Sequence, residues 1–208
     1  MSQPMSGRRA QAARNDQVIL DAAREVFVAN PAAPIAAVAE HAGVGISALY
    51  RRYPSKEELL RKLCTDGLQL YIDVAEQALA ADTDPWTSFA EFMKGAVAAE
   101  SSALTRTLAG TFKPTEELYR MATHAAQLNT ELVRRVKEAG LIRKDVEVED
   151  LALIFEQLTA IKVGDPERSS RLRQRYLAII LDSLREPPEH TELPEPAPTA
   201  DELSSRWG

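Results

Sequence analysis

Apolar residues recur along most of this chain with the three- and four-residue spacing of amphipathic helices. Short helices are predicted at about 35–42 and 46–53, on either side of Gly43, and no segment shows a convincing strand pattern. A helix before them is expected to begin at Asn15 as its N-cap, with an apolar stripe formed by Val18, Ile19, Ala22, Ala23, Val26 and Phe27. The pattern therefore predicts an all-α protein of about nine helices.

Proline, glycine and capping residues set the remaining boundaries. Pro54 ends the third helix, and Ser55 with Glu58 forms a capping box that opens a long helix reaching about Asp82. The same signals predict further helices from Asp84, over 101–112, from 113–115 to Gly140, over 147–163 and over 166–185.

These boundaries divide the chain into four regions. The last one holds five prolines and six acidic residues and lacks apolar periodicity, so we expect it to be disordered. The regions are a flexible basic N-terminal arm at 1–14, a helix-turn-helix domain at 15–54, a linker helix with a C-terminal helical domain at 55–185, and a disordered acidic, proline-rich tail at 186–208.

Charge is distributed unevenly along the 208 residues, whose formal net charge is -6. Residues 1–62 carry nine Lys/Arg against six Asp/Glu, a net of +3, so the remainder carries -9. A basic end on an acidic chain indicates that only this end meets a polyanion. No apolar run is long enough for a membrane helix, no secretory signal is visible, and Cys64 is the single cysteine, which predicts a cytoplasmic protein with Cys64 in its core.

The turn between the second and third predicted helices has the sequence GVG at 43–45. Gly43 can take the positive φ that a tight turn requires, and Val44 can fill the space between the helices. Leu49 is expected to face inward, which leaves small, polar and basic side chains on the other face of the third helix. Because such a face can enter the major groove, the segment predicts a DNA-binding helix-turn-helix.

The expected DNA contacts combine base and phosphate recognition. Side chains at the start of the third helix can contact base edges, whereas tyrosine hydroxyls, the next helix N-terminus and N-terminal arginines can bind phosphates. A core position is the alternative for each tyrosine. A solvated helix face is the alternative for Arg51, and a flexible terminus is the alternative for the N-terminal arginines. The full predicted set is Gly45, Ile46, Ser47, Ala48, Tyr50, Arg51, Tyr53, Ser55, Lys56, Arg9 and Arg14.

The segment PIAAVAEHAGVGISALYRRYPSKEELL resembles the DNA-binding domain of the tetracycline-repressor (TetR) family of regulators. The likeness runs from about Asn15 to Leu60 and is most specific from Ala42 onward. It implies an all-α homodimer in which the last two helices form a four-helix interface. It also implies that a small molecule bound in the body alters the spacing of the two recognition helices. Gly45 departs from the family pattern, which often has a capping serine or threonine there, and Pro34 replaces a common phosphate-binding threonine.

The C-terminal domain is predicted to bind a small apolar or amphipathic effector that releases the protein from a pseudo-palindromic operator. Core packing is the alternative for each aromatic residue, and an exposed or structurally satisfied position is the alternative for His124. The expected ligand contacts are Trp86, Phe89, Phe92, Met93, Phe112, Tyr119, His124, Leu128 and Phe155. The expected dimer contacts are Leu151, Leu158, Ile161, Leu172, Tyr176, Ile179 and Ile180.

No catalytic or metal-binding pattern is visible in the sequence. The histidines, His41, His124 and His190, lie far apart, and the helix dipole explains the carboxylate pairs at helix starts. We therefore expect a ligand-responsive repressor rather than an enzyme, without a cofactor or a metal. The expected partners are operator DNA, the effector and a second copy of the chain. The alternative is a helical ligand-binding or adaptor protein without DNA-binding activity.

Overall fold

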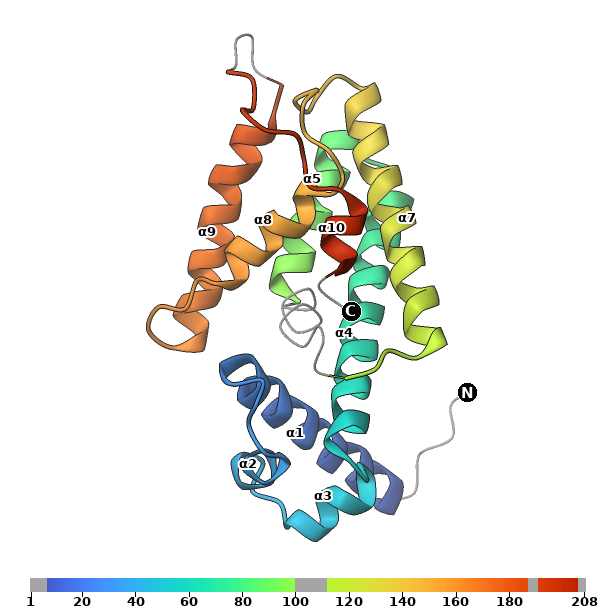
Figure 1. Cartoon of the computed structure of the whole chain (residues 1–208), viewed down its shortest axis with the longest axis vertical. Helices are drawn as coiled ribbons and strands as arrows, with labels where there is room; N and C mark the ends of the chain where they lie inside the picture. The colour runs from blue at the N-terminus through green and yellow to red at the C-terminus, as the bar shows by residue number, and fades with distance from the viewer. Residues whose placement is uncertain (1–6, 100–111, 187–190, 206–208) are drawn as a thin grey trace.

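The computed structural model describes residues 7–99, 112–186 and 191–205, with side chains from residue 14 onward. Within these ranges the chain forms nine helices and one isolated pairing, between Ile142 and Arg185. A small head made of α1, α2 and α3 lies below a larger helical body, and α4 extends from one into the other (Figure 1). The prediction of an all-α fold with an N-terminal helix-turn-helix unit and a C-terminal helical domain is confirmed.

The head consists of α1 (Gly7–Ala29), α2 (Ile35–His41) and α3 (Ile46–Arg52). Because α1 begins at Gly7, Asn15 lies inside this helix instead of capping it, and half of the expected N-terminal arm is helical. Residues 7–14 are mostly alanine and arginine, which favour helix and allow α1 to extend toward the N-terminus. Helix α1 packs on α2, and α2 packs on α3. The buried core of the head includes Ile19, Ala23 and Phe27 of α1, Val38 of α2 and Leu49 of α3.

Helix α4 (Lys56–Ala80) belongs to both parts of the molecule. Ser55 caps it, since the Ser55 hydroxyl oxygen accepts a hydrogen bond from the Glu58 amide at 3.1 Å. Leu59 and Leu60 are buried at its head end, and α4 packs against α1 there and against α5 and α7 in the body. Cys64, expected in the core, is fully buried, and burial raises the pKa of its thiol to about 12.

The body is formed by α5 (Pro85–Ala98), α7 (Glu116–Glu138), α8 (Asp150–Thr159) and α9 (Pro166–Leu184). Helices α5 and α7 pack on α4, and α8 and α9 pack on α5 (Figure 1). The Asp84 carboxylate caps α5 by accepting the amides of Trp86 and Thr87 at 3.1 and 3.0 Å, as predicted. Close packing of α5 on α4 depends on Gly95, because a Cβ there would lie 2.6 Å from a methyl carbon of Val74. The helix expected at 101–112 lies outside the described residues, except for Phe112.

Part of the C-terminal tail contacts the body. A short helix, α10 (Ala200–Ser204), begins at a capping box formed by Thr199 and Glu202. Arg143 donates a hydrogen bond to the Thr191 carbonyl at 2.8 Å, and the Leu193 amide donates to Asp145 at 3.3 Å. Residues 191–205 therefore contain a helix and contact the body, although composition alone predicts disorder. The capping box stabilises the helix, and the two hydrogen bonds hold the start of the segment on the body.

Candidate nucleic-acid interface

The turn of the helix-turn-helix has the predicted geometry. Gly43 has φ 64°, in the left-handed region where a side chain is strained, and no atom lies within 4 Å of where its Cβ would be. The amides of Gly43 and Val44 donate to the carbonyls of Glu40 and Ala39 at 3.1 and 3.0 Å. These two bonds close α2 in the manner of a Schellman turn and direct the chain into α3.

Helix α3 turns one side to the head core and the other to solvent. Leu49 is fully buried, whereas Ile46 and Tyr50 are 40% and 46% exposed. Ser47 and Arg51 are also exposed, and Ala48 is partly so. The outer face therefore combines small, hydroxyl-bearing and basic side chains, as the sequence predicts. Gly45 is the N-cap residue and provides no side-chain hydrogen bond, so the α3 N-terminus projects without a capping side chain.

Arg51 and Arg52 are adjacent in sequence but differ in their partners. Arg51 is exposed, and among the described residues it makes no hydrogen bond or ion pair. Arg52 is held by Asp16 of α1, with Arg52 Nε 2.7 Å from Asp16 Oδ1. Of the two guanidinium groups, that of Arg51 is thus the one available to a ligand outside the head.

Tyr53 occupies a different place from the one predicted. It is only 5% exposed, and its hydroxyl donates to Asp16 Oδ1 at 2.6 Å. Burial, reinforced by this bond to a carboxylate, raises the pKa of Tyr53 well above its ordinary value. The aromatic ring of Tyr53 is therefore part of the head core, and the expected phosphate contact from its hydroxyl is corrected.

Lys56 is likewise used inside the head. Its ammonium donates to the carbonyls of Pro31 and Ala33 at 2.9 and 2.7 Å and lies 5.0 Å from the ring centroid of Phe27. These contacts tie the start of α4 to the loop between α1 and α2. Two of the three ammonium protons are thereby occupied. Lys56 therefore stabilises the head and is not the free phosphate ligand that the sequence suggests.

The N-terminal arginines lie on α1 instead of on a separate arm. Arg14 is exposed, and the side chain of Arg9 is outside the described part of the chain. Since Asp16 contacts the last residue of α3, the segment of α1 that carries Arg14 lies beside the C-terminal end of α3. Both arginines thus remain candidates for a contact beside the recognition helix.

Most of the predicted ligand contacts lie together in the body core. Phe92 and Phe155 pack edge-to-face at 6.2 Å, and each makes a similar contact with Tyr71, at 5.4 and 6.1 Å. The Tyr71 hydroxyl donates to Asn129 at 2.9 Å. The sequence reasoning missed Tyr71, although its place on the apolar stripe of α4 is a usable signal. The remaining buried members of the predicted set are Trp86, Phe89, Met93 and Phe112, with Leu128 partly buried.

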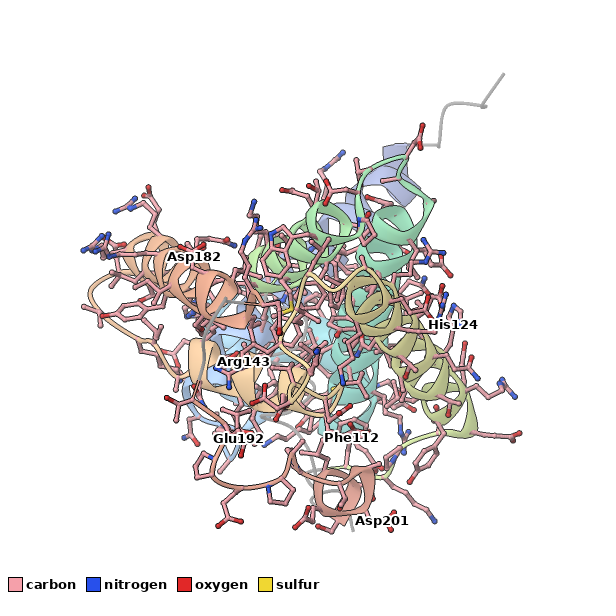
Figure 2. The ribbon with its side chains drawn as sticks, turned by 90° about the horizontal axis from the view of Figure 1, so that it is seen from above. Phe112, His124, Arg143, Asp182, Glu192 and Asp201 are labelled. Carbon is pink, nitrogen blue, oxygen red and sulfur yellow. The ribbon has the colours of Figure 1, made fainter. Side chains whose placement is uncertain are left out.

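Two predicted ligand contacts lie outside this core. Tyr119 is 58% exposed. His124 is at the edge of the molecule formed by α7, opposite the edge formed by α9 (Figure 2), and its Nε2 is 2.9 Å from a carboxylate oxygen of Glu76. Both residues lie on α7 with Leu128, but on the solvent side of that helix. Neither side chain therefore joins the cluster around Phe92, and their assignment to an interior ligand site is corrected.

The predicted dimer contacts divide in the same way. Leu151 and Leu158 of α8 are 1% and 2% exposed within a single subunit, so they are core residues and not contacts for a partner. On α9, Tyr176 and Ile179 are 49% and 54% exposed. Partly buried neighbours complete an apolar surface with them, and we name this surface the α9 stripe: Leu172, Tyr176, Ile179 and Ile180. Ile161 is partly buried against the core.

The described residues contain no group of three or more His, Cys, Asp or Glu side chains placed to hold a metal ion. None of their helices is both long enough and apolar enough to span a membrane.

The family comparisons match both parts of the chain. Residues 19–63 match the model described as bacterial regulatory proteins, tetR family, and residues 84–186 match the C-terminal domain of SbtR-like transcriptional regulators. No curated protein sequence gives a significant match. The first match covers most of the head and the start of α4, and it favours a DNA-binding regulator over an adaptor without DNA-binding activity.

Solved structures agree with the family models. A TetR regulatory protein from Mycobacterium vanbaalenii is 27% identical with a TM-score of 0.54, and the match covers 85% of this chain and 98% of that one. PfmR, a TetR family transcriptional regulator of Thermus thermophilus, is 22% identical with a TM-score of 0.56, covering 79% and 97%.

A third structure, the TetR-like regulator LfrR of Mycobacterium smegmatis in complex with proflavine, shares the fold. Its identity to this chain is 19% and its TM-score 0.58, with 86% and 99% of the two chains covered. The two family models and the shared fold lead to one conclusion: this chain belongs to the TetR family of transcriptional regulators.

Proposed function

We propose that this regulator acts in the cytoplasm as a homodimeric repressor, which binds a pseudo-palindromic operator and is released by a small apolar or amphipathic effector. The observation that supports DNA binding most strongly is that the basic and tyrosine side chains near the end of α3 differ in whether they have partners in the head. Hydrogen bonds within the head engage Arg52, Tyr53 and Lys56. Arg51, in contrast, is exposed on the same helix as the small residues of the first turn of α3.

We assign the base contacts to the first turn of α3. Ile46 and Ala48 offer apolar surface for a thymine methyl group, and the Ser47 hydroxyl can donate to or accept from a base edge. Arg51 is one turn further along and can bind guanine or a phosphate. The Tyr50 hydroxyl, the amides at the Ser55-capped start of α4 and Arg14 are assigned to phosphates, which fix the position of the head without reading sequence.

The α9 stripe supports a homodimer. Successive residues of the stripe are four, three and one positions apart, so they share a face of α9. Leu177 and Leu181 are buried on the face of α9 toward the body. Two large apolar side chains that are half exposed favour an interface with another chain. A twofold pairing through this stripe would present two α3 helices related by the same axis, which predicts a palindromic operator.

The effector is assigned to the body because aromatic side chains gather there around Tyr71, Phe92 and Phe155. LfrR, with the same fold, is known in complex with proflavine. Two contacts can carry a change in the body to the head. Lys162 donates to the Val28 carbonyl at 3.0 Å, and the Glu57 carboxylate accepts the Lys113 amide at 3.3 Å.

Selection from a pool of random duplexes tests this proposal. We expect an enriched sequence with twofold symmetry, bound by two copies of the chain, and weaker binding to a single half-site. Enrichment of an asymmetric sequence by one copy would contradict the homodimer, and no enrichment at all would contradict sequence-specific binding.

A thermal-shift screen of apolar and amphipathic compounds tests the effector. Stabilising compounds should lower the affinity for the selected duplex, because a ligand that prefers the released conformation shifts the population toward it. Compounds that stabilise the protein while leaving its affinity for the duplex unchanged would contradict this part of the proposal.

A further inference from the structure

Asp16 of α1 accepts three hydrogen bonds from the C-terminal end of α3. Arg52 donates from Nε to Asp16 Oδ1 and from Nη2 to Asp16 Oδ2, both at 2.7 Å, and the Tyr53 hydroxyl donates to Oδ1 at 2.6 Å. We name these three residues the Asp16 clamp. The clamp joins positions that are 36 and 37 residues apart in sequence, so it links two helices and does not stabilise either one alone.

The geometry makes this contact stronger than an ordinary surface ion pair. Two parallel hydrogen bonds between a guanidinium and a carboxylate fix the direction of both groups, which a single contact from a lysine does not. The Asp16 side chain is 17% exposed, and the Arg52 side chain is 56% exposed. The hydrogen bonds from Arg52 hold the pKa of Asp16 below its ordinary value, so the carboxylate is ionised at neutral pH.

The opposite end of α3 has no comparable restraint. Gly45 offers no side-chain cap, and α3 is only seven residues long. Its direction on the head is therefore set by the buried Leu49 and by the Asp16 clamp. Since successive residues of a helix point about 100° apart, a clamp on Arg52 also fixes the direction in which Arg51 leaves α3.

We propose that Asp16 is a positioning residue for operator discrimination, which fixes the C-terminal end of α3 and keeps the Arg52 guanidinium away from the DNA. This inference rests on the proposed function, because it assumes that α3 reads the operator. Without Asp16, Arg52 would carry a free positive charge beside the recognition helix. Such a charge can pair with any phosphate and would strengthen binding to DNA of any sequence.

The decisive variant is Asp16→Asn, which keeps the shape of the side chain and removes its charge. Affinity is measured for the selected operator and for a scrambled duplex of equal length, over a series of salt concentrations. We expect the ratio of the two affinities to fall about tenfold. We also expect tighter binding to the scrambled duplex. The salt slope, which is the slope of log affinity against log salt concentration, should become steeper by about 0.9, the value for one added phosphate contact.

The second variant adds Arg52→Ala to Asp16→Asn. It should return the salt slope and the scrambled-duplex affinity to those of the unaltered protein, because the freed guanidinium is gone, while the affinity ratio stays low because α3 remains unclamped. The matched control is Asp21→Asn on the same helix. Asp21 is exposed and pairs within α1, with Arg24 at 3.0 Å, so its removal should leave the ratio unchanged.

Equal affinity ratios for Asp16→Asn and the unaltered protein would overturn the inference. So would an equal loss of affinity for both duplexes in step with a lower melting temperature, since that is the signature of a purely structural contact. If Asp16→Asn does not fold, Arg52→Lys is judged by its affinity ratio alone, because it keeps the charge and loses the bidentate geometry. Failure of the unaltered protein to discriminate the two duplexes would refute the proposed function instead.

Discussion

Lys162, in the loop that follows α8, donates a hydrogen bond to the carbonyl oxygen of Val28, 134 positions earlier in the chain, at 3.0 Å. Val28 is in the last turn of α1, where helix carbonyls lack partners within the helix and carry the negative end of the helix dipole. A cation from the body thus completes the end of a head helix. This contact therefore links the two parts of the molecule directly.

Replacing Lys162 with methionine should loosen the C-terminal turn of α1 while leaving the body intact. We expect a loss of about 0.5–1 kcal/mol of local stability, seen as about two- to fivefold faster hydrogen exchange of the amides near Val28. Lys144→Met is the matched control, since Lys144 is exposed and makes no hydrogen bond among the described residues. Equal exchange in both variants would show that the bond does not hold the head.

Loss of the Lys56 ammonium should destabilise the head. Lys56→Met removes two charge-assisted hydrogen bonds to loop carbonyls and leaves those carbonyls partly unsatisfied, so we expect the free energy of unfolding to fall by about 2 kcal/mol in urea titrations. Lys62→Met serves as the comparison, because Lys62 pairs with Asp66 on the surface of the same helix and should contribute less than about 0.5 kcal/mol. Similar losses in the two variants would refute the structural role of Lys56.

The two glycines that flank the turn should respond in opposite directions to the same change. Gly45→Ser supplies an oxygen for the uncapped amides of α3, and space is open around the new Cβ, so a gain of a few tenths of a kcal/mol, about 0.3, is expected. Gly43→Ser forces a side chain into the left-handed region and should cost about 1–2 kcal/mol. Thermal unfolding of both variants measures the contrast, and a loss of stability in Gly45→Ser would contradict it.

The contact of the tail with the body should depend on Asp145. The Arg143 guanidinium holds the pKa of Asp145 below its ordinary value of 3.8, so the ionised contact is present above that pH and is lost only as the pH falls through the lower value. Asp145→Asn should therefore expose 191–205 to proteases at neutral pH several-fold faster than the unaltered protein. Asp182→Asn, a change at an exposed position on α9 (Figure 2), should not.

Local signals in the sequence account for most of the helix boundaries. Asp84 and Ser55 cap helices where predicted, and Gly140 has the positive φ expected at a helix end. These features depend on a few neighbouring residues, which sequence reasoning can weigh directly. The predicted start of α1 is wrong because Asn15 is a good N-cap when considered alone. The residues before Asn15 are equally compatible with helix.

The roles of individual side chains were harder to predict because they depend on partners that are distant in sequence. Tyr53 and Lys56 lie in a segment that suggests DNA contacts, yet both turn inward, to Asp16 and to the carbonyl of Pro31. Similarly, Leu151 of α8 and Ile179 of α9 each belong to an apolar stripe with helical spacing. Leu151 is nevertheless in the core, whereas Ile179 is exposed. Periodicity identifies an apolar face without showing whether the same chain covers it.

The central claim is that α3 reads DNA with Arg51 as its free cation, and the salt dependence of operator binding tests it most directly. Arg51→Ala should leave the unfolding free energy within about 0.5 kcal/mol of the unaltered protein, because Arg51 has no partner among the described residues. The same variant should lower operator affinity by about 1–3 kcal/mol if Arg51 reads a base, or reduce the salt slope by about 0.9 if it binds a phosphate. Operator affinity and salt slope both unchanged in Arg51→Ala would contradict the account.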